Sequence, residues 1–320
     1  MRKGILHSAV TGLLLSGLVQ ANEYKEISAN GGEINWTTAK ITASGYGRAN
    51  DDADKKLAPL LACRAATVDA QRNLLETVQG TRITSATTVN NFMLKDDSVK
   101  TSVEGVIKGA RVTSRAFDRD KVCTITMAID MNGPLAQTVY QAENGDQQQA
   151  FRIPTLDWIA NLTWNVSFFP TANADDIAPN WVESIEQRLA EIENRLLSGT
   201  PEKIEDTTSP TGLVIDARGS NFIPSLSPKI REIRSGVIYP DSKSKSSAIS
   251  NGHLVSLFAT DVDFAIRHPK VGDRPLVVKA LRTYGDTRTE IVLGKESSEQ
   301  LREMTESNDF VDAGVIIVLD

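Results

Sequence analysis

The strongest hydrophobic pattern of the chain lies near its start, where residues 57–79 repeat apolar side chains at helical spacing before Gly80. The predicted helix carries one broad apolar arc, made of Leu57, Leu60, Leu61, Cys63, Val68, Ala70, Leu74, Leu75 and Val78. A single broad arc implies one covering layer, so we expect the helix to lie on a sheet. Arg64 falls within the same arc, which is an unexpected place for a charged residue.

Alternating polar and apolar positions predict the strands of that sheet. Residues 35–47 alternate up to a Gly-Tyr-Gly turn, and residues 121–131 alternate more regularly. Residues 81–94 and 98–118 are also interpreted as extended stretches. The region therefore predicts an N-terminal helix packed on a small antiparallel sheet.

The N-terminus has the pattern of a secretory signal peptide. Arg2 and Lys3 precede an apolar run over residues 5–19, and small side chains lead up to Ala21. We expect cleavage after Ala21. A membrane anchor is the alternative, but the run is shorter than the roughly 20 apolar residues that span a bilayer. No later segment is apolar enough to cross a membrane, so no transmembrane span is expected in the mature chain.

The two cysteines of the chain, Cys63 and Cys123, are predicted to form a disulfide. Cys123 lies on the apolar face of the strand 121–131, and Cys63 lies on the apolar arc of the helix that should cover it. An even number of cysteines in an exported protein favours pairing, although two separate buried thiols remain the alternative. The bridge would close a loop of about 60 residues and contribute roughly 3–4 kcal/mol in the chain-entropy model.

Residues 180–199 give the most regular helical pattern of the chain. Steps of three and four residues form a narrow apolar seam of Val182, Ile185, Leu189, Ile192 and Leu196. The seam fits self-association, a strut between domains, or packing on the core of its own domain. The helix is too short to hold a dimer together alone.

The patterns divide the chain into six parts and predict an α+β fold. These are a signal peptide (1–21), a helix-on-sheet module (22–143), an aromatic-rich connector (144–179), the amphipathic helix (180–199), a linker (200–210) and a C-terminal α+β domain (211–320). In the last domain we expect strands at 212–219, 236–240 and 313–320, a hairpin-like pair within 274–294, a helix at 297–307 and a polar loop at 241–252.

Composition and motifs argue against several functions. The 320 residues carry a net charge of -6 without a dense Lys/Arg cluster, so no nucleic-acid partner is expected. His253 and His268 lack metal-ligand spacing, and we find no Walker A motif, dinucleotide fingerprint or nucleophile elbow. We therefore predict no metal, no cofactor and no enzymatic activity. The run Asp-Ala-Arg-Gly-Ser-Asn at residues 216–221 follows a strand, and we interpret it as a structural turn rather than a site.

Residues 41–131 resemble an exported family that includes the Helicobacter twenty-kilodalton outer-membrane lipoprotein and the flagellar proteins FlgP and FlgT. The matching positions are Gly45, Tyr46, Gly47, Arg64, Ala65, Ala66, Asp69, Ala70, Arg72, Asn73, Leu74, Glu76, Gly80, Gly105, Gly109, Ala110 and Val112. The resemblance implies a helix-on-sheet module that assembles into rings or disks around the flagellar basal body. It singles out Arg64, Asp69, Arg72, Asn73 and Gly80 as candidates for assembly, with Arg64 either passing the sheet edge or meeting an acidic group of a neighbouring subunit.

These observations together predict a non-enzymatic periplasmic protein that forms homo-oligomers within a flagellar ring or a related envelope assembly. Its partners would be other flagellar or envelope proteins, and association with the outer membrane is a further expectation. The alternative is a module that binds or senses peptidoglycan or another ligand through the C-terminal domain. That alternative draws on the aromatic stretch 156–170 and on residues 216–221.

Overall fold

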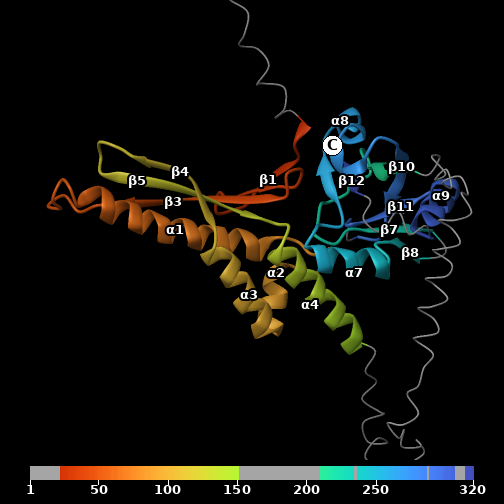
Figure 1. The fold of residues 1–320 in the computed structure, drawn as a ribbon, viewed down its shortest axis with the longest axis horizontal. Coiled ribbons are helices and arrows are strands. Elements are labelled where there is room, and N and C mark those ends of the chain that lie inside the picture. The colour runs from red at the N-terminus through yellow and green to blue at the C-terminus, as the bar shows by residue number, and fades with distance from the viewer. Residues whose placement is uncertain (1–21, 151–209, 234–235, 287, 307–313) are drawn as a thin grey trace, which may run out of the picture. The chain divides into compact units, whose positions relative to one another are not determined.

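The computed structural model describes residues 22–150, 210–233, 236–286, 288–306 and 314–320 (Figure 1). The chain divides into two compact units, one formed by residues 1–146 with 210–320 and the other by 147–209. The segments predicted to be a signal peptide (1–21) and an amphipathic helix (180–199) lie outside the described residues. Within the described part, no helix is both long and apolar enough to cross a membrane.

Five antiparallel strands form the N-terminal sheet, in the order β1-β2-β3-β5-β4. Their bounds are β1 Lys25–Ile27, β2 Glu33–Asn35, β3 Lys40–Arg48, β4 Arg111–Phe117 and β5 Val122–Asp130. Buried positions alternate along β3 and β5, as expected of a sheet covered on one face. Helix α1, Ala58–Gly80, runs along that covered face (Figure 1). The predicted antiparallel sheet with a covering helix is therefore confirmed.

The face that α1 turns to the sheet differs from the predicted arc. Its buried positions are mainly alanines spaced four apart, namely Ala58, Ala62, Ala66 and Ala70, followed by Leu74, Thr77 and Val78. The predicted arc members Leu57, Leu60, Leu61 and Val68 are 54%, 67%, 55% and 63% exposed. The reason is a very close approach, because a Cβ on Gly45 or Gly47 would collide with the α1 backbone. Only small side chains fit between two backbones at that distance.

The stretches 81–94 and 98–118 were wrongly predicted to be extended throughout. They form α2, Val89–Lys95, and α3, Asp97–Lys108, before the chain enters β4. Thr88 and Asn91 make a capping box at α2, and the Asp96 carboxylate accepts from the Ser98 N–H at 2.7 Å to cap α3. Val99, Val103 and Ile107 are buried at four-residue spacing, which is a helical rather than a strand period.

The predicted boundary between the module and the connector, at residues 143 and 144, falls inside a helix. Helix α4 runs over Pro134–Ala150. Its first turns are anchored by buried Leu135, Val139 and Tyr140. Glutamine and alanine are good helix formers, so the polar sequence that follows continues the helix instead of starting a linker.

The C-terminal sheet has seven strands in the order β8-β7-β11-β10-β6-β12-β9. The strands are β6 Gly212–Asp216, β7 Lys229–Glu232, β8 Gly236–Tyr239, β9 Leu257–Ala259, β10 Pro275–Thr283, β11 Glu290–Leu293 and β12 Val315–Val318. Strands β10, β6, β12 and β9 are parallel, whereas β10 and β11 form the predicted antiparallel pair. All four residues of β12 are buried, which makes the closing strand part of the core.

Short helices connect these strands. They are α7 Ser242–Asn251, α8 Val262–Ile266, the 3-10 turn η3 Pro269–Val271 and α9 Lys295–Glu306. Helix α9 agrees with the sequence prediction, but α7 replaces the polar loop expected at 241–252. The Asp241 carboxylate caps α7 by accepting from the Ser244 N–H, and Gly252 ends it with a φ of 67°.

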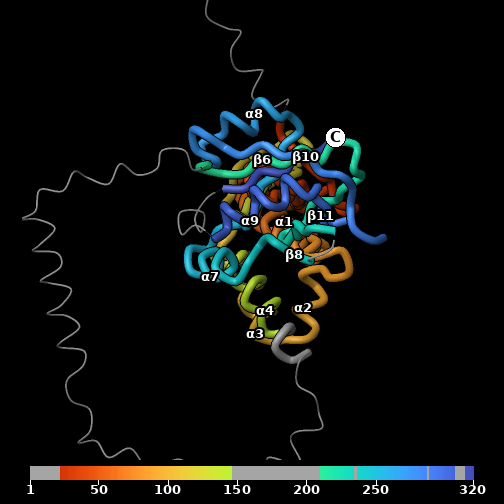
Figure 2. The backbone as a smooth tube through the Cα atoms, turned by 90° about the vertical axis from the view of Figure 1, so that its right-hand side faces the viewer, coloured from red at the N-terminus to blue at the C-terminus, as the bar shows by residue number. Residues whose placement is uncertain are grey.

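One hydrophobic core runs through both sheets of this unit. Trp36 of the N-terminal module meets Phe258 edge-on, with ring centroids 5.5 Å apart. Tyr140 of α4 donates from its hydroxyl to the Leu226 carbonyl at 2.7 Å and accepts from the Val255 N–H at 3.1 Å. Figures 1 and 2 both show α2, α3 and α4 close together on one side of α1. The module and the C-terminal sheet are thus held by shared packing and buried hydrogen bonds.

Candidate functional site

Two polar residues singled out in α1 close the outer edge of β3. Strand β2 pairs with β3 only as far as Thr42, so the rest of that edge has no neighbouring strand among the residues that the structure describes. The Asp69 carboxylate accepts from the Tyr46 N–H at 2.9 Å, and the Asn73 amide donates to the Ser44 carbonyl at 2.9 Å. These side chains satisfy backbone groups that would otherwise need a strand or water. Asp69 and Asn73 are therefore structural in this unit.

The other candidate residues of α1 face outward or end the helix. Arg72 pairs with Glu76 one turn later, at 3.1 Å, in an exposed contact worth about 0.3–0.5 kcal/mol. Gly80 is the last residue of α1. Arg64 is exposed instead of buried in the core, and it has no ion pair among the described residues. The prediction that Arg64 lies on the core face is wrong, because the alanine stripe two positions away faces the sheet.

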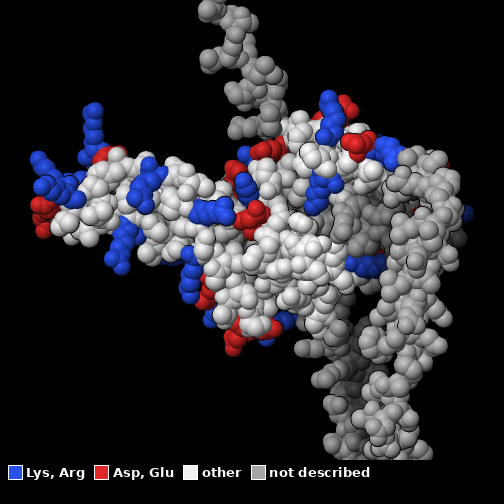
Figure 3. Space-filling model, viewed as in Figure 1, with Lys and Arg blue, Asp and Glu red and all other residues white. Residues whose placement is uncertain are grey.

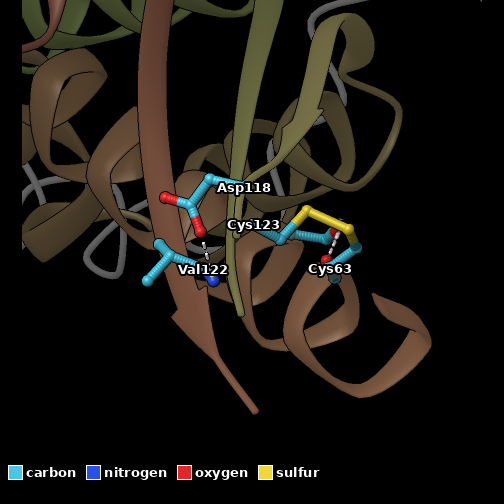
Figure 4. The surroundings of a disulfide bond; sticks show 5 residues. Cys63, Asp118, Val122 and Cys123 are labelled. Atoms are coloured by element: carbon cyan, nitrogen blue, oxygen red, sulfur yellow. Dashed lines mark hydrogen bonds between the residues drawn. A yellow bond between two sulfur atoms is a disulfide. The ribbon is translucent and has the colours of Figure 1, made fainter. Parts of the chain in front are cut away.

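The predicted disulfide is present between Cys63 of α1 and Cys123 of β5 (Figure 4). It joins the helix to the sheet across a sequence separation of 60 residues. Beside it, the Asp118 carboxylate accepts from the Val122 N–H at 2.9 Å and so shapes the turn into β5. A loop of this length corresponds to about 4 kcal/mol in the chain-entropy model. The bond adds a covalent tie to a helix whose buried face is made largely of alanine.

Strand β4 forms an open edge beside α1. All seven of its residues are exposed, including Val112 at 45% and Phe117 at 40%. Pairing with β5 places Val112, Arg115 and Phe117 opposite Met127, Ile125 and Cys123, whose side chains are buried on the α1 side of the sheet.

Next to this strand, the outward side of α1 presents Leu60, Arg64 and Val68, which are four residues apart and share one side of the helix. We call these three residues and Val112, Arg115 and Phe117 the α1–β4 face. The sequence did not reveal it, because the exposed leucines were assigned to the core.

The turn at residues 216–221 bonds mainly within itself. Arg218 donates to both oxygens of the Asp216 carboxylate, at 2.8 Å and 2.9 Å, and this contact holds the pKa of Asp216 below its usual value. The Gly219 N–H donates to Asp320 at 2.8 Å. Gly219 and Asn221 both have positive φ, at 74° and 60°. The segment forms a turn whose polar groups bond largely to one another and to the C-terminal Asp320.

Sequence reasoning missed two charged groups that lie away from solvent, the buried Glu143 and the half-buried Lys270. Glu143 of α4 accepts from the Ser227 hydroxyl at 2.8 Å and lies 3.6 Å from the Lys245 ammonium. Lys270 donates to the Leu254 carbonyl at 3.1 Å, and burial lowers its pKa to about 8. No local motif signals either group, because partners distant in sequence bury them. Among the described residues, no three His, Cys, Asp or Glu side chains form a group that could hold a metal ion.

Comparison with known proteins matches two segments of the chain. Residues 36–125 match the model of the LPP20 lipoprotein family, and residues 212–320 match the model of the second domain of Treponema pallidum Tp0624. No curated protein matches the chain. The resemblance inferred from the motifs of residues 41–131 is confirmed for this segment. The chain is thus similar to an LPP20 lipoprotein domain over its N-terminal helix and sheet, and to the Tp0624 second domain over its C-terminal sheet.

Proposed function

We propose that this protein is a non-enzymatic structural component of the bacterial cell envelope that assembles with copies of itself, in a flagellar basal-body ring or a related structure. The observation that carries the proposal is that several motif residues hold α1 against β3. Gly45 and Gly47 admit the helix, and Asp69 and Asn73 bond to the β3 backbone. The polar side chains of Asp69 and Asn73 are thus engaged in holding α1 on the sheet. A module built in this way is suited to act as a rigid building block.

Three observations support a place in the envelope. The N-terminal module matches the LPP20 lipoprotein family. The first 21 residues have the pattern of a signal peptide. The disulfide Cys63–Cys123 requires an oxidising compartment, which the periplasm provides. We assign the mature chain to the periplasm on these grounds, with association with the outer membrane.

Self-association would come from residues 180–199, whose sequence predicts an amphipathic helix with a narrow seam. A short helix needs support from elsewhere to hold copies together. The unit formed by residues 1–146 and 210–320 could offer further contacts, because its two sheets share one hydrophobic core.

The direct test is the mass of mature chain 22–320 in solution, measured by light scattering across a concentration series and followed by electron microscopy. We expect oligomers that Leu189→Glu dissociates, while Glu191→Gln, which changes a residue outside the seam, leaves them intact. A monomer at every concentration, together with normal motility in a deletion strain, would reject the assembly.

One observation favours the second candidate function, ligand binding by the C-terminal domain. The turn 216–221 lies at the carboxyl end of β6, between the parallel neighbours β10 and β12, where open sheets often bind ligands. Sedimentation with purified peptidoglycan tests it. Binding that Arg218→Ala abolishes and Arg267→Ala retains would favour this function, and absence of binding would exclude peptidoglycan.

A further inference from the structure

We propose that the α1–β4 face docks on an anionic phospholipid bilayer. This inference goes beyond assembly, since it concerns a different surface from the seam at 180–199. Four of the six residues of the face are apolar and two are arginines, and none is acidic. A surface that is both apolar and cationic has the composition of a site that inserts shallowly at a membrane interface.

The arginines of this face have no counter-ion in the unit. Neither Arg64 nor Arg115 forms an ion pair with any residue that the structure describes, whereas Arg48, Arg72 and Arg82 each pair with a carboxylate. Figure 3 shows Lys and Arg side chains spread over the part of the surface that α1 and β4 occupy in Figure 1, with fewer Asp and Glu there. The chain as a whole is acidic, with a net charge of -6, so this local excess of positive charge runs against the total.

The apolar members are unusually open to solvent. Leu60 and Val68 stand on the outward side of a helix whose inward side is filled with alanine. Val112 and Phe117 lie on an edge strand that α1 leaves uncovered. Each element thus sets exposed apolar side chains beside an arginine, and lipid headgroups with the upper acyl chains satisfy both kinds of side chain at once.

A second copy of the chain matches this face less well. Two copies meeting through this same face would oppose two surfaces that each carry two arginines and no acidic side chain, which like-charge repulsion disfavours. Pairing of two β4 edges is hindered by the bulge between Val112 and Ser114 and by the arginines of the strand.

An acidic stripe elsewhere on the unit lies on α9, where Glu296, Glu299, Glu303 and Glu306 are exposed. No large apolar side chain is exposed along this helix, so the stripe offers nothing to cover the leucine, the valines and the phenylalanine of the α1–β4 face. The complement of this face is therefore a surface that is anionic and apolar together, as a bilayer interface is.

The test is cosedimentation of mature chain 22–320 with vesicles of phosphatidylcholine alone or with about 30 mol % phosphatidylglycerol, at low and high salt. We expect binding only to the anionic vesicles, weakening as salt rises. The double variant Arg64→Gln/Arg115→Gln should lower the partition coefficient at least tenfold, and Leu60→Glu should lower it by a similar factor.

Matched controls lie outside the face. Lys100→Gln/Arg274→Gln removes the same charge from other exposed positions, and Leu94→Glu changes a leucine that is 78% exposed on α2. Both controls should keep most of the binding. No binding to anionic vesicles, equal binding to neutral ones, or equal losses in the controls would overturn the proposal.

A change in solution mass with the face variants, without any vesicle binding, would overturn it in favour of a protein partner. Intact helix content and an intact disulfide in each variant confirm that it is folded. Because the 180–199 seam is unchanged in these variants, their failure to bind lipid leaves the assembly proposal to its own test.

Discussion

The two sheets of the unit formed by residues 1–146 and 210–320 bury different kinds of side chain. Strands β6 and β12 of the C-terminal sheet bury Leu213, Val214, Ile215, Ile316 and Ile317, so branched side chains fill the space around them. The N-terminal sheet buries an alanine stripe against glycine and leaves leucines outside. The C-terminal sheet is stabilised by the large apolar area that it buries, whereas the interface between α1 and the N-terminal sheet is stabilised by close packing of the two backbones. A large apolar residue in the sequence therefore predicts a buried position only where the helix and the sheet are far enough apart to hold its side chain.

The largest loss of stability is expected from a side chain placed where α1 touches β3. Gly47→Val should cost more than about 4 kcal/mol or prevent folding, because its Cβ meets the backbone of Ala62 and Ala66. Urea denaturation monitored by circular dichroism measures the loss. Gly105→Ala in α3 is the matched control, since nothing lies within 4 Å of its Cβ, and it should stabilise by up to about 1 kcal/mol. Equal stability of the two variants would disprove the close-packing account.

The disulfide tests how far the alanine interface depends on a covalent tie. Cys63→Ala/Cys123→Ala should lower the free energy of unfolding by about 4 kcal/mol, because the 60-residue loop is no longer closed in the unfolded chain. Calorimetry of the double variant and of the wild type in reductant should give the same lowered transition. A wild-type transition indifferent to reductant would contradict this prediction.

In the C-terminal part of the unit, Lys270 is expected to lower the stability, because its charged side chain is partly removed from water. Its folded pKa of about 8 lies below the ordinary 10.5, so the unfolded chain binds the proton more tightly. The resulting destabilisation is fully present below pH 8 and disappears as pH rises from about 8 to 10.5. Lys270→Met should stabilise by about 2–3 kcal/mol at pH 7, after the loss of one hydrogen bond to Leu254.

The measurement for Lys270 is the free energy of unfolding of both proteins at pH 7 and pH 10. The advantage of the variant should shrink at the higher pH. An advantage that stays constant with pH would show that the ammonium is not the cause.

The smallest expected effect concerns the side chains that replace a strand beside β3. Asp69→Ala should cost about 1–2 kcal/mol, because the Tyr46 N–H loses its acceptor at a partly solvated edge. Hydrogen exchange at the Tyr46 amide should rise more than exchange at the amides of β5. Asp97→Ala, which changes an exposed carboxylate in the first turn of α3, serves as the control and should leave Tyr46 protected.

Sequence patterns correctly predicted the long helix and the strictly alternating strands, because both follow from local hydrophobic periodicity. They also predicted the disulfide, because both cysteines fell on apolar faces and an exported protein was expected to oxidise them. They misassigned the inward face of α1, since Gly45 and Gly47 decide it from another strand. The short helices α2, α3 and α7 were missed because their caps were given less weight than nearby alternation.

For the candidate sites, too, the sequence identified residues but not the tertiary contacts that they make. The motif named Asp69 and Asn73 but could not say that they bond to a strand edge, which is a tertiary fact. The Lys270 ammonium donates to the Leu254 carbonyl, 16 residues away in sequence, and no local pattern announces that contact. The open edge at β4 follows from strand order, which alternation alone does not determine.

The side-chain closure of the β3 edge has a consequence for the order in which the module folds. The bonds of Asp69 and Asn73 span 23 and 29 residues, whereas β3 and β5 pair across intervals such as the 82 residues between Ser44 and Thr126. Contacts between nearby residues form sooner, because less chain entropy is lost in closing them. We therefore expect helix α1 to cover this edge of β3 before β5 pairs with the opposite edge, so that the edge is open to other chains only briefly.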